Sequence, residues 1–191
     1  GLDRFVQERA EAGVPLLGAC LGMQLLFDGS EEFGGCEGLG LIGGRVVELE
    51  THGLNLPHIG WNTVDWERAT PLSAGLEEGR PFYHVHSFAP QPTDPETVLG
   101  TSDYGSRFAS VVGRGSVLGT QFHPEKSSRD GIRLLANFVA LEELHAEFSG
   151  ITHAGLVELA KSKSLRLVHV SRDQAAEGIA TLAPKITFDV K

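Results

Sequence analysis

The chain has 191 residues, of which 41% are hydrophobic and 21% charged, as in an ordinary globular domain. Its formal net charge of −9 argues against a nucleic-acid partner, because phosphate binding normally requires a basic face. No apolar run approaches the roughly 20 residues of a membrane span, and two cysteines are too few for a disulfide framework, so we expect a cytoplasmic protein.

Helix and strand patterns alternate at the start of the chain. Apolar residues at helical spacing predict a helix over 2–12 that ends at Gly13. The short apolar run 14–19 predicts a buried parallel strand, and a helix is expected over 21–27. Strand, tight turn and helix in succession indicate an α/β fold. Because the helical pattern begins at once, without an initiator methionine, we expect the start of the protein to be missing.

The middle of the chain is rich in short strands. A compact glycine-rich loop is expected over 34–44, and a final amphipathic helix over 131–144. Between them, strands are predicted at 45–50, 59–66, 81–88, 97–101, 109–113 and 117–122. Strands this dense suggest that the sheet continues with antiparallel members.

The last part of the chain has a different residue pattern. Patterns there predict helices near 156–161 and 173–182 and strands at 165–170 and 186–190, which together would form a small βαβ-like unit. We find no chemistry in this segment.

The first chemical signal is the pentapeptide Gly-Ala-Cys-Leu-Gly at 18–22, between a predicted strand and a predicted helix. This is the layout of a nucleophile elbow, with Cys20 where hydrolases place serine. Small residues on both sides let the backbone turn sharply. The turn would present the sulfur at a helix N-terminus, which favours the thiolate, and would aim the N–H of Leu21 at an oxyanion. The alternative is a buried cysteine in a core strand.

The second signal is Gln-Phe-His-Pro-Glu at 121–125, at the end of a predicted strand. A catalytic cysteine needs a base, and the base needs an orienting group. His123 and Glu125 have the i, i+2 spacing that allows the carboxylate to hold the imidazole. A surface turn is the alternative for this motif alone. Two strand ends that carry a cysteine and a histidine favour a shared site at the carboxyl edge of a sheet.

The remaining cysteine and histidines offer weaker signals. Cys36 lies in the glycine-rich loop with no nearby base, and we interpret it as structural or incidental. His84 and His86 share one face of a predicted strand and could form a metal pair, but no third ligand is spaced to join them. We therefore expect no metal.

The two motifs, extended to 18–24 and 121–127, resemble those of the class I (triad) glutamine amidotransferases. Three further stretches resemble the glutaminase subunits of imidazole glycerol phosphate synthases: 30–32 with 38–40, Pro-His-Ile-Gly-Trp-Asn at 57–62, and Tyr-His-Val-His-Ser-Phe at 83–88. The resemblance covers residues 1–141 and implies a three-layer α/β fold around a mixed, mainly parallel sheet. It places an amidotransferase domain at 1–144 and leaves 145–191 as an unassigned extension.

The resemblance also implies a mechanism without a cofactor. Cys20 would attack the side-chain amide of glutamine to form a thioester, His123 would pass a proton to the departing ammonia, and Glu125 would hold His123. The residues implied for glutamine binding are Gln24, Glu32, Ser87 and Phe88.

The implied partner is a cyclase subunit, a (β/α)8 barrel that uses the ammonia to make imidazole glycerol phosphate in histidine biosynthesis. The residues implied to face it are Trp61, Asn62, Tyr83 and Lys126. The family's first strand and its Pro-Gly-x-Gly loop, which supplies a second oxyanion donor, have no counterpart in this sequence. We therefore expect the chain alone to be poorly active or unstable. Two alternatives stay open: a sister amidotransferase feeding another synthase, and a non-catalytic fragment that binds the partner.

Overall fold

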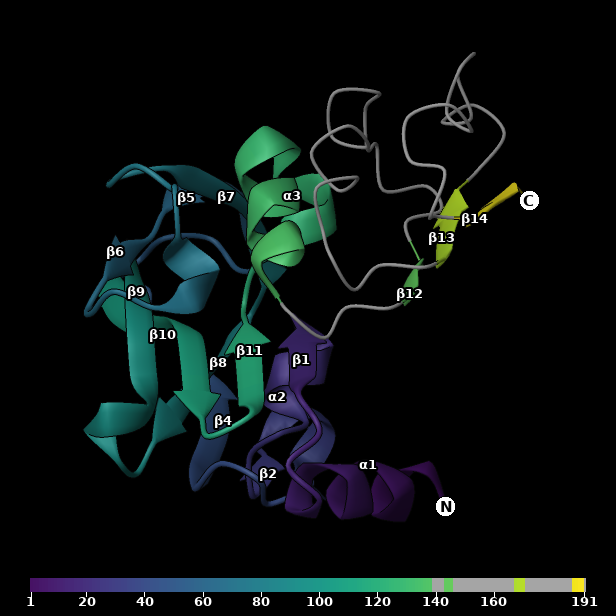
Figure 1. Ribbon diagram of the computed structural model, residues 1–191. Coiled ribbons are helices and arrows are strands. Elements are labelled where there is room, and N and C mark those ends of the chain that lie inside the picture. Colours follow the sequence, from purple (N-terminus) through teal and green to yellow (C-terminus); the bar gives the residue numbers. More distant parts are fainter. Residues whose placement is uncertain (139–142, 146–166, 171–186, 191) are drawn as a thin grey trace. The chain divides into compact units, whose positions relative to one another are not determined.

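The computed structural model describes residues 1–138, 143–145, 167–170 and 187–190 (Figure 1). The chain divides into two compact units, and each is treated by itself: the first comprises Gly1–Ala69 and Glu78–His123, the second Thr70–Glu77 and Pro124–Lys191. Among the described residues, no helix is long and apolar enough to cross a membrane.

The first unit opens with helix α1 (Leu2–Glu11), which ends just before Gly13 at φ 73°, as predicted. The helix contributes little to the core, because its apolar residues Leu2 and Phe5 are 77% and 58% exposed. It is held instead by Ala10, which packs on the core, and by Gln7, whose side-chain amide donates to the Leu39 carbonyl at 2.9 Å.

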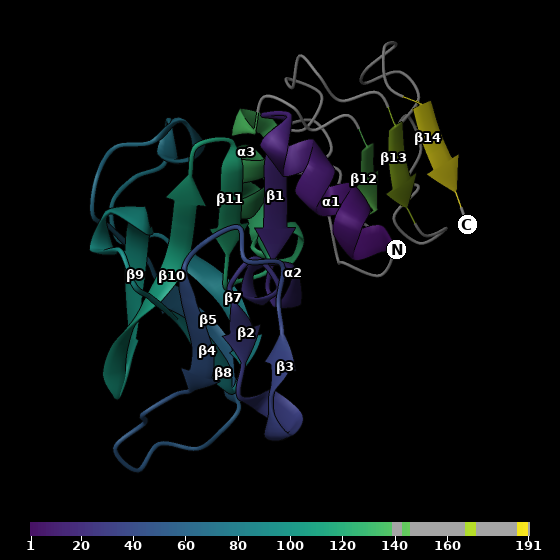
Figure 2. The same ribbon diagram turned by 90° about the horizontal axis from the view of Figure 1, so that it is seen from below.

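A five-stranded sheet, ordered β1-β11-β10-β9-β6, forms the centre of this unit. Its bounds are β1 (Leu16–Ala19), β6 (Asp65–Trp66), β9 (Val98–Tyr104), β10 (Ser106–Arg114) and β11 (Val117–Thr120). Only β1 and β11 run parallel, and Figure 2 shows their arrows side by side with β10 reversed. Consecutive strands β9, β10 and β11 are joined by turns at Gly105 and Gly115, which suffice only for antiparallel neighbours.

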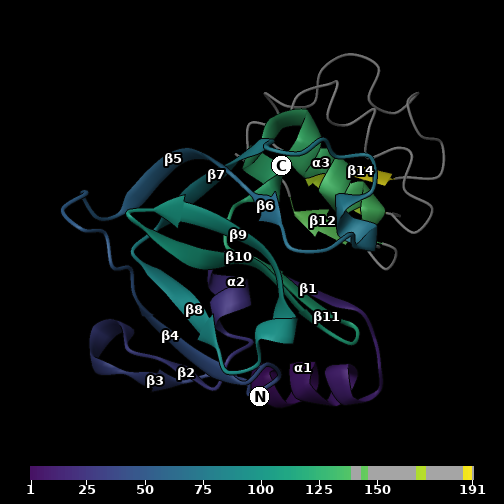
Figure 3. The ribbon, with the colours of Figure 1, turned by 90° about the vertical axis from the view of Figure 1, so that its left-hand side faces the viewer.

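Two smaller sheets complete the unit. The first is ordered β3-β2-β4-β8, with bounds β2 (Gly29–Ser30), β3 (Cys36–Glu37), β4 (Gly44–Glu48) and β8 (Phe88–Pro92). The second is a pair of antiparallel strands, β5 (His58–Thr63) and β7 (Pro81–His86), which packs against β9 at one end of the central sheet (Figure 3). Short 3-10 turns, η1 (Glu32–Gly34) and η3 (Pro95–Thr97), lie between strands.

The α/β class is confirmed, but the prediction of a mainly parallel sheet is wrong for the described residues. Parallel pairing occurs at β1–β11, β2–β4, β12–β13 and β13–β14, whereas the remaining six strand pairs are antiparallel. Parallel neighbours need a crossover of a dozen or more residues, and between 98 and 120 the chain uses tight turns instead.

The helix predicted over 21–27 is also shorter than expected. Helix α2 covers only Leu21–Gln24, and the chain continues in turns to Phe27. These turns bury Met23, Leu26 and Phe27 in the main core. The core residues that surround them come from β4, β10, β11 and the loop before β4: Ile42, Val46, Ala109, Val112 and Val117.

The second unit contains turns η2 (Pro71–Ser73) and η4 (Pro124–Lys126), helix α3 (Ser128–Asn137) and a parallel sheet of β12 (Glu143–His145), β13 (Leu167–Val170) and β14 (Thr187–Val190). The helix predicted over 131–144 stops early. Phe138 is extended, and the Asn137 side chain donates to the carbonyls of Leu72 and Ala74 at 3.0 and 2.8 Å. Residues 143–144 lie in a strand rather than a helix.

The predictions for the tail are only partly covered by the structure. Its two strands are present at Leu167–Val170 and Thr187–Val190 and pair in parallel. The helices predicted near 156–161 and 173–182 lie outside the described residues.

Gly18 and Gly22 flank the elbow symmetrically in sequence but not in space. A Cβ on Gly18 would lie 2.5 Å from the Gly22 carbonyl carbon and oxygen, whereas a Cβ on Gly22 would meet nothing within 4 Å. We expect Gly18→Ala to lower the free energy of unfolding by about 2 kcal/mol or more, because backbone atoms must shift. Gly22→Ala, inside helix α2, is the matched control and should be neutral or stabilising by about 0.5–1 kcal/mol. Urea denaturation measures both, and equal losses would contradict this account.

Candidate active site

Cys20 occupies a strained turn between β1 and α2. Its φ and ψ are 51° and −111°, a left-handed conformation that a residue with a side chain rarely adopts and that costs about 1–3 kcal/mol. The turn is fixed from β11, because the Cys20 N–H donates to the Thr120 carbonyl at 2.7 Å. The nucleophile elbow expected from the sequence is therefore the geometry that Cys20 has.

Two groups lie against the sulfur. The Sγ atom is 3.8 Å from the Val85 carbonyl oxygen, and the side-chain amide nitrogen of Gln121 is 4.0 Å from Sγ. A thiol donates to the carbonyl, whereas a thiolate accepts from the amide, so Gln121 is placed to support the anionic form. Sequence reasoning assigned no role to Gln121 or Val85. In the sequence, the only signal for Gln121 was its position two residues before His123. In the structure Gln121 is fully buried, and a buried amide needs hydrogen-bond partners.

Gln24 reaches the same region from helix α2. Its side-chain nitrogen donates to the Phe88 carbonyl at 2.9 Å and to the Gln121 side-chain oxygen at 3.3 Å. Both amide protons of Gln24 therefore have acceptors, which fixes which way its side chain points.

A cavity of about 300 Å³ opens beside the sulfur. It brings together six residues that the sequence placed in the site: Cys20, Leu21, Gln24, Glu32, Ser87 and Phe88. Three residues without a predicted role also line it: Phe33, Val85 and His86. Leu21 occupies the first position of α2, where a helix N–H lacks an intrahelical acceptor. The pocket thus brings together the thiol of Cys20, the helix N-terminal backbone at Leu21 and the carboxylate of Glu32.

His123 follows β11 at the edge where Cys20 follows β1. The register pairs Ala19 with Thr120, so both residues leave the carboxyl ends of adjacent parallel strands. The N–H of His123 donates to the Tyr83 carbonyl at 2.9 Å. Glu125 and Lys126 belong to η4 in the second unit, where Glu125 is half-buried and Lys126 exposed.

The residues expected to face a partner lie on the β5–β7 pair, apart from Lys126. Trp61 is 54% exposed and meets the ring of Tyr83 edge to face at 6.1 Å between centroids. Asn62 points the other way, and its side-chain nitrogen donates to the Asp103 carbonyl at 2.7 Å. Ile59, one of the exposed residues on the Trp61 face, is 60% exposed and was not predicted.

A buried histidine cluster comprises His58, His84 and His86, of which His86 lines the cavity. Burial lowers the pKa of His84 to about 3 and that of His86 to about 4, and neighbouring histidines, His123 among them, lower both pKa values further. Burial also lowers the pKa of His58. His84 and His86 do share one strand face, but their Nε2 atoms contact Ser110 and His58, and the described residues contain no group of three side chains suited to a metal.

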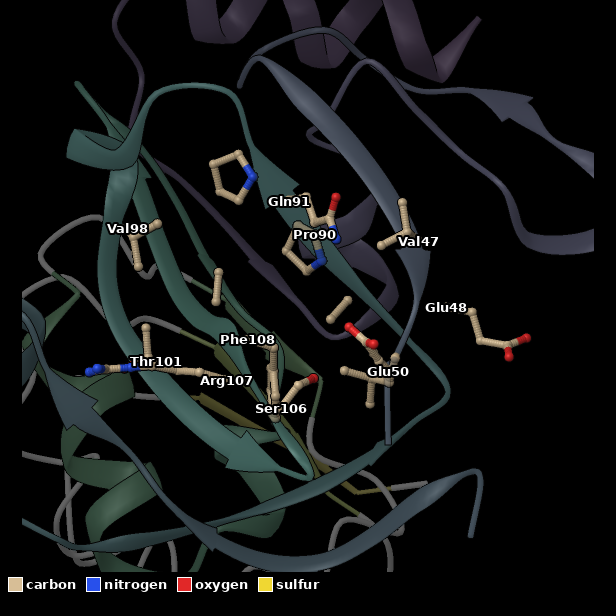
Figure 4. Close-up of a pocket in the computed structure, with 14 residues that line it drawn as sticks. Val47, Glu48, Glu50, Pro90, Gln91, Val98, Thr101, Ser106, Arg107 and Phe108 are labelled. Carbon is tan, nitrogen blue, oxygen red and sulfur yellow. The ribbon is translucent and has the colours of Figure 1, made fainter. Parts of the chain in front are cut away.

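A larger cavity, of about 390 Å³, lies between strands β4 and β8 on one side and β9 and β10 on the other (Figure 4). Its charged residues are Glu48, Glu50 and Arg107, and Arg107 is already paired with Glu67 at 2.7 Å. Neither a cysteine nor a histidine lines it. The chemistry of the first unit therefore centres on the smaller pocket at Cys20.

Comparison with known proteins identifies the family of the chain. Residues 3–141 match the family described as glutamine amidotransferase class-I. The chain belongs to this family, which confirms the resemblance seen in the motifs. Among solved structures, a glutamine amidotransferase from Thermotoga maritima is 18% identical with a TM-score of 0.49, covering 70% of this chain and 50% of that one, a likeness too low to carry an argument.

Within the family, the chain is similar to proteins named imidazole glycerol phosphate synthase subunit HisH. It is 53% identical over 138 residues to that of Symbiobacterium thermophilum, covering 72% of this chain and 65% of the relative. It is 49% identical over 146 residues to that of Geobacillus kaustophilus, covering 74% and 69%. The chain thus spans about two thirds of the length of these relatives.

Because the buried histidines are neutral in the folded chain, we expect the free energy of unfolding to fall in acid. An unfolded histidine has its ordinary pKa near 6.5, whereas folded His86 and His84 have pKa values of about 4 and 3. Between these limits the unfolded chain binds more protons, so each histidine should lower the free energy of unfolding as pH falls, with a slope that approaches about 1.4 kcal/mol per pH unit well below pH 6.5. Denaturant titrations at pH 7, 6 and 5 measure this slope. His84→Phe should reduce it and exposed His52→Gln should not; an unchanged slope in His84→Phe would refute the assignment.

Proposed function

We propose that this chain is the glutaminase part of a two-subunit synthase, hydrolysing glutamine to glutamate and ammonia. The observation that carries the proposal is the strained elbow of Cys20, which opens onto a pocket of about 300 Å³ with Gln24, Glu32 and the Ser87–Phe88 backbone around it. Strain of this kind persists where the surrounding structure enforces it, and it places the sulfur clear of its own backbone.

In the proposed reaction, the Cys20 thiolate attacks the carbonyl carbon of the glutamine side chain. The negative charge that develops on the oxygen receives a hydrogen bond from the N–H of Leu21. The imidazolium of His123 gives its proton to the nitrogen as the carbon–nitrogen bond breaks, which releases ammonia and leaves a thioester. His123 then takes a proton from water, whose oxygen attacks the thioester, and glutamate leaves with the thiolate restored.

The remaining site residues hold the substrate and the base. The carboxylate of Glu32 suits the α-ammonium group of glutamine, and the side-chain oxygen of Gln24, with the backbone at Ser87, is proposed to meet its other polar atoms, while Phe88 lines the pocket beside them. Glu125 follows His123 by two residues, a spacing that allows its carboxylate to orient the imidazole and stabilise the imidazolium.

We further propose that the ammonia passes to a (β/α)8 cyclase subunit that makes imidazole glycerol phosphate. The names of the similar proteins, as subunits of that synthase, support a partner. Exposed Trp61 with Tyr83 beside it supplies the kind of aromatic anchor that protein interfaces favour. Asn62 and Lys126 are also proposed to contact the cyclase. The amidotransferase domain is proposed to span 1–144, with 145–191 as a separate extension.

A glutamine-analogue electrophile tests the chemistry directly. We expect 6-diazo-5-oxo-norleucine to label Cys20 in the presence of the cyclase, because the sulfur attacks the analogue as it would the amide. Peptide mass spectrometry locates the adduct. Cys20→Ala should abolish labelling and Cys36→Ala should leave it intact, since Cys36 is exposed but lies outside the elbow.

The outcomes separate the alternatives. Labelling with no release of ammonia in the presence of the cyclase would point to a sister enzyme with another partner. No labelling, with the cyclase bound, would indicate a non-catalytic binding fragment and contradict the proposed function.

Partner binding can be tested at Trp61. We expect Trp61→Ala to raise the dissociation constant for the cyclase about 30-fold or more, because a buried interface tryptophan commonly contributes about 2 kcal/mol or more to the binding free energy. Leu2→Ala, which removes a similarly exposed apolar side chain from α1, should have no effect. Calorimetric titration measures both, and equal affinities for the two variants would place the interface elsewhere.

A further inference from the structure

A line of side-chain contacts runs from strand β5 to the wall of the Cys20 pocket. The side-chain nitrogen of Asn62 lies 3.4 Å from Nε2 of His58, and Nδ1 of His58 lies 3.1 Å from Nε2 of His86. Nδ1 of His86 then lies 2.9 Å from the Phe88 carbonyl oxygen. His58 and His86 are 3% and 6% exposed, so water does not compete for these contacts.

Each nitrogen or oxygen in this line can act in only one way, either as hydrogen-bond donor or as acceptor. The Phe88 carbonyl can only accept, so the proton of His86 sits on Nδ1. His86 is buried and neutral, so its Nε2 has a lone pair and accepts from Nδ1–H of His58. His58 therefore also carries its proton on Nδ1, and its Nε2 accepts from the Asn62 amide, which can only donate. All three hydrogen bonds point from Asn62 toward the pocket.

The line ends on an atom that also orients the pocket. The Phe88 carbonyl accepts a second hydrogen bond at 2.9 Å from Gln24, whose other amide proton meets Gln121. Gln121 in turn lies beside the Cys20 sulfur. With both lone pairs of the carbonyl in use, a change at His86 alters the position that Gln24 can take.

We propose that His58 and His86 are positioning residues: a one-way relay of neutral imidazoles that connects Asn62 on strand β5 to the Phe88 carbonyl and, through it, to Gln24. The relay rests on the proposed function only where it concerns glutamine, because its hydrogen bonds belong to the folded chain. A hydrogen-bond change at Asn62 is then transmitted to the pocket wall without a rearrangement of the backbone. The cluster residue His84 lies outside the relay, since it bonds the Phe82 carbonyl and Ser110.

Nitrogen-15 NMR of the full chain at pH 7 tests the relay without any need for activity. We expect His58 and His86 both to be neutral with the proton on Nδ1, the less common tautomer of free histidine. An Nε2–H tautomer or a charged ring at either residue would overturn the relay.

Three variants separate positioning from mere packing. His58→Phe keeps the ring stacked on Tyr104, at 4.1 Å between centroids, but cannot donate to His86. His58→Asn restores a donor near the position of Nδ1. Ser110→Ala removes a hydrogen bond from the same cluster but outside the relay, and it is the matched control.

In His58→Phe we expect the NMR signals of the Gln24 side-chain amide to shift and the KM for glutamine to rise about tenfold, with a smaller change in kcat. His58→Asn should restore both toward the original values, and Ser110→Ala should change neither. Equal effects of His58→Phe and Ser110→Ala would overturn the positioning role. If the chain proves to have no glutaminase activity, the tautomers and the Gln24 signals still decide the relay.

Discussion

The parallel pairing of β1 with β11 is the constraint on which the proposed chemistry depends. Its register sets Ala19 beside Thr120, and the Cys20 N–H continues the ladder by donating to the Thr120 carbonyl at 2.7 Å. Parallel strands end at the same edge, so the residues that follow them, Cys20 and His123, emerge together although they are about a hundred positions apart in sequence. The core residues under the elbow, such as Met23, hold that edge in place.

Much of the fold could be predicted from local pattern, and the failures have physical causes. The helix ending before Gly13 and the strand before Cys20 follow directly from composition. Strand β8 (Phe88–Pro92) was not predicted as a separate strand, because proline disfavours strands. The structure tolerates Pro90 and Pro92 there because both lie on one side of an edge strand. The density of short strands did indicate antiparallel members, but the resemblance implied a mainly parallel sheet, so the excess of antiparallel pairs was not foreseen.

The candidate site, like the fold, could be predicted only in part from the sequence. Residue type and turn chemistry pointed to Cys20 and Leu21, and the motif resemblance pointed to four others that line the pocket: Gln24, Glu32, Ser87 and Phe88. Gln121 and Val85 were missed because their roles come from a buried amide and a backbone carbonyl, which no side-chain pattern reveals. The buried histidines looked like a weak metal pair in sequence. In the structure the Nδ1 atoms of His84 and His86 hydrogen-bond to the Phe82 and Phe88 carbonyls, and Nδ1 of His58 lies 3.1 Å from Nε2 of His86, so these nitrogens already have partners within the protein.

The central claim is that the Cys20 sulfur and the His123 imidazole meet on one side of the sheet. A crystal structure of the chain bound to the proposed cyclase subunit, with a glutamine analogue attached to Cys20, measures this most directly. The account predicts an imidazole nitrogen of His123 within about 3–4 Å of the sulfur or of the analogue's departing group, the reach that proton transfer requires. An imidazole turned to the opposite face of the sheet, with another base beside the sulfur, would contradict it.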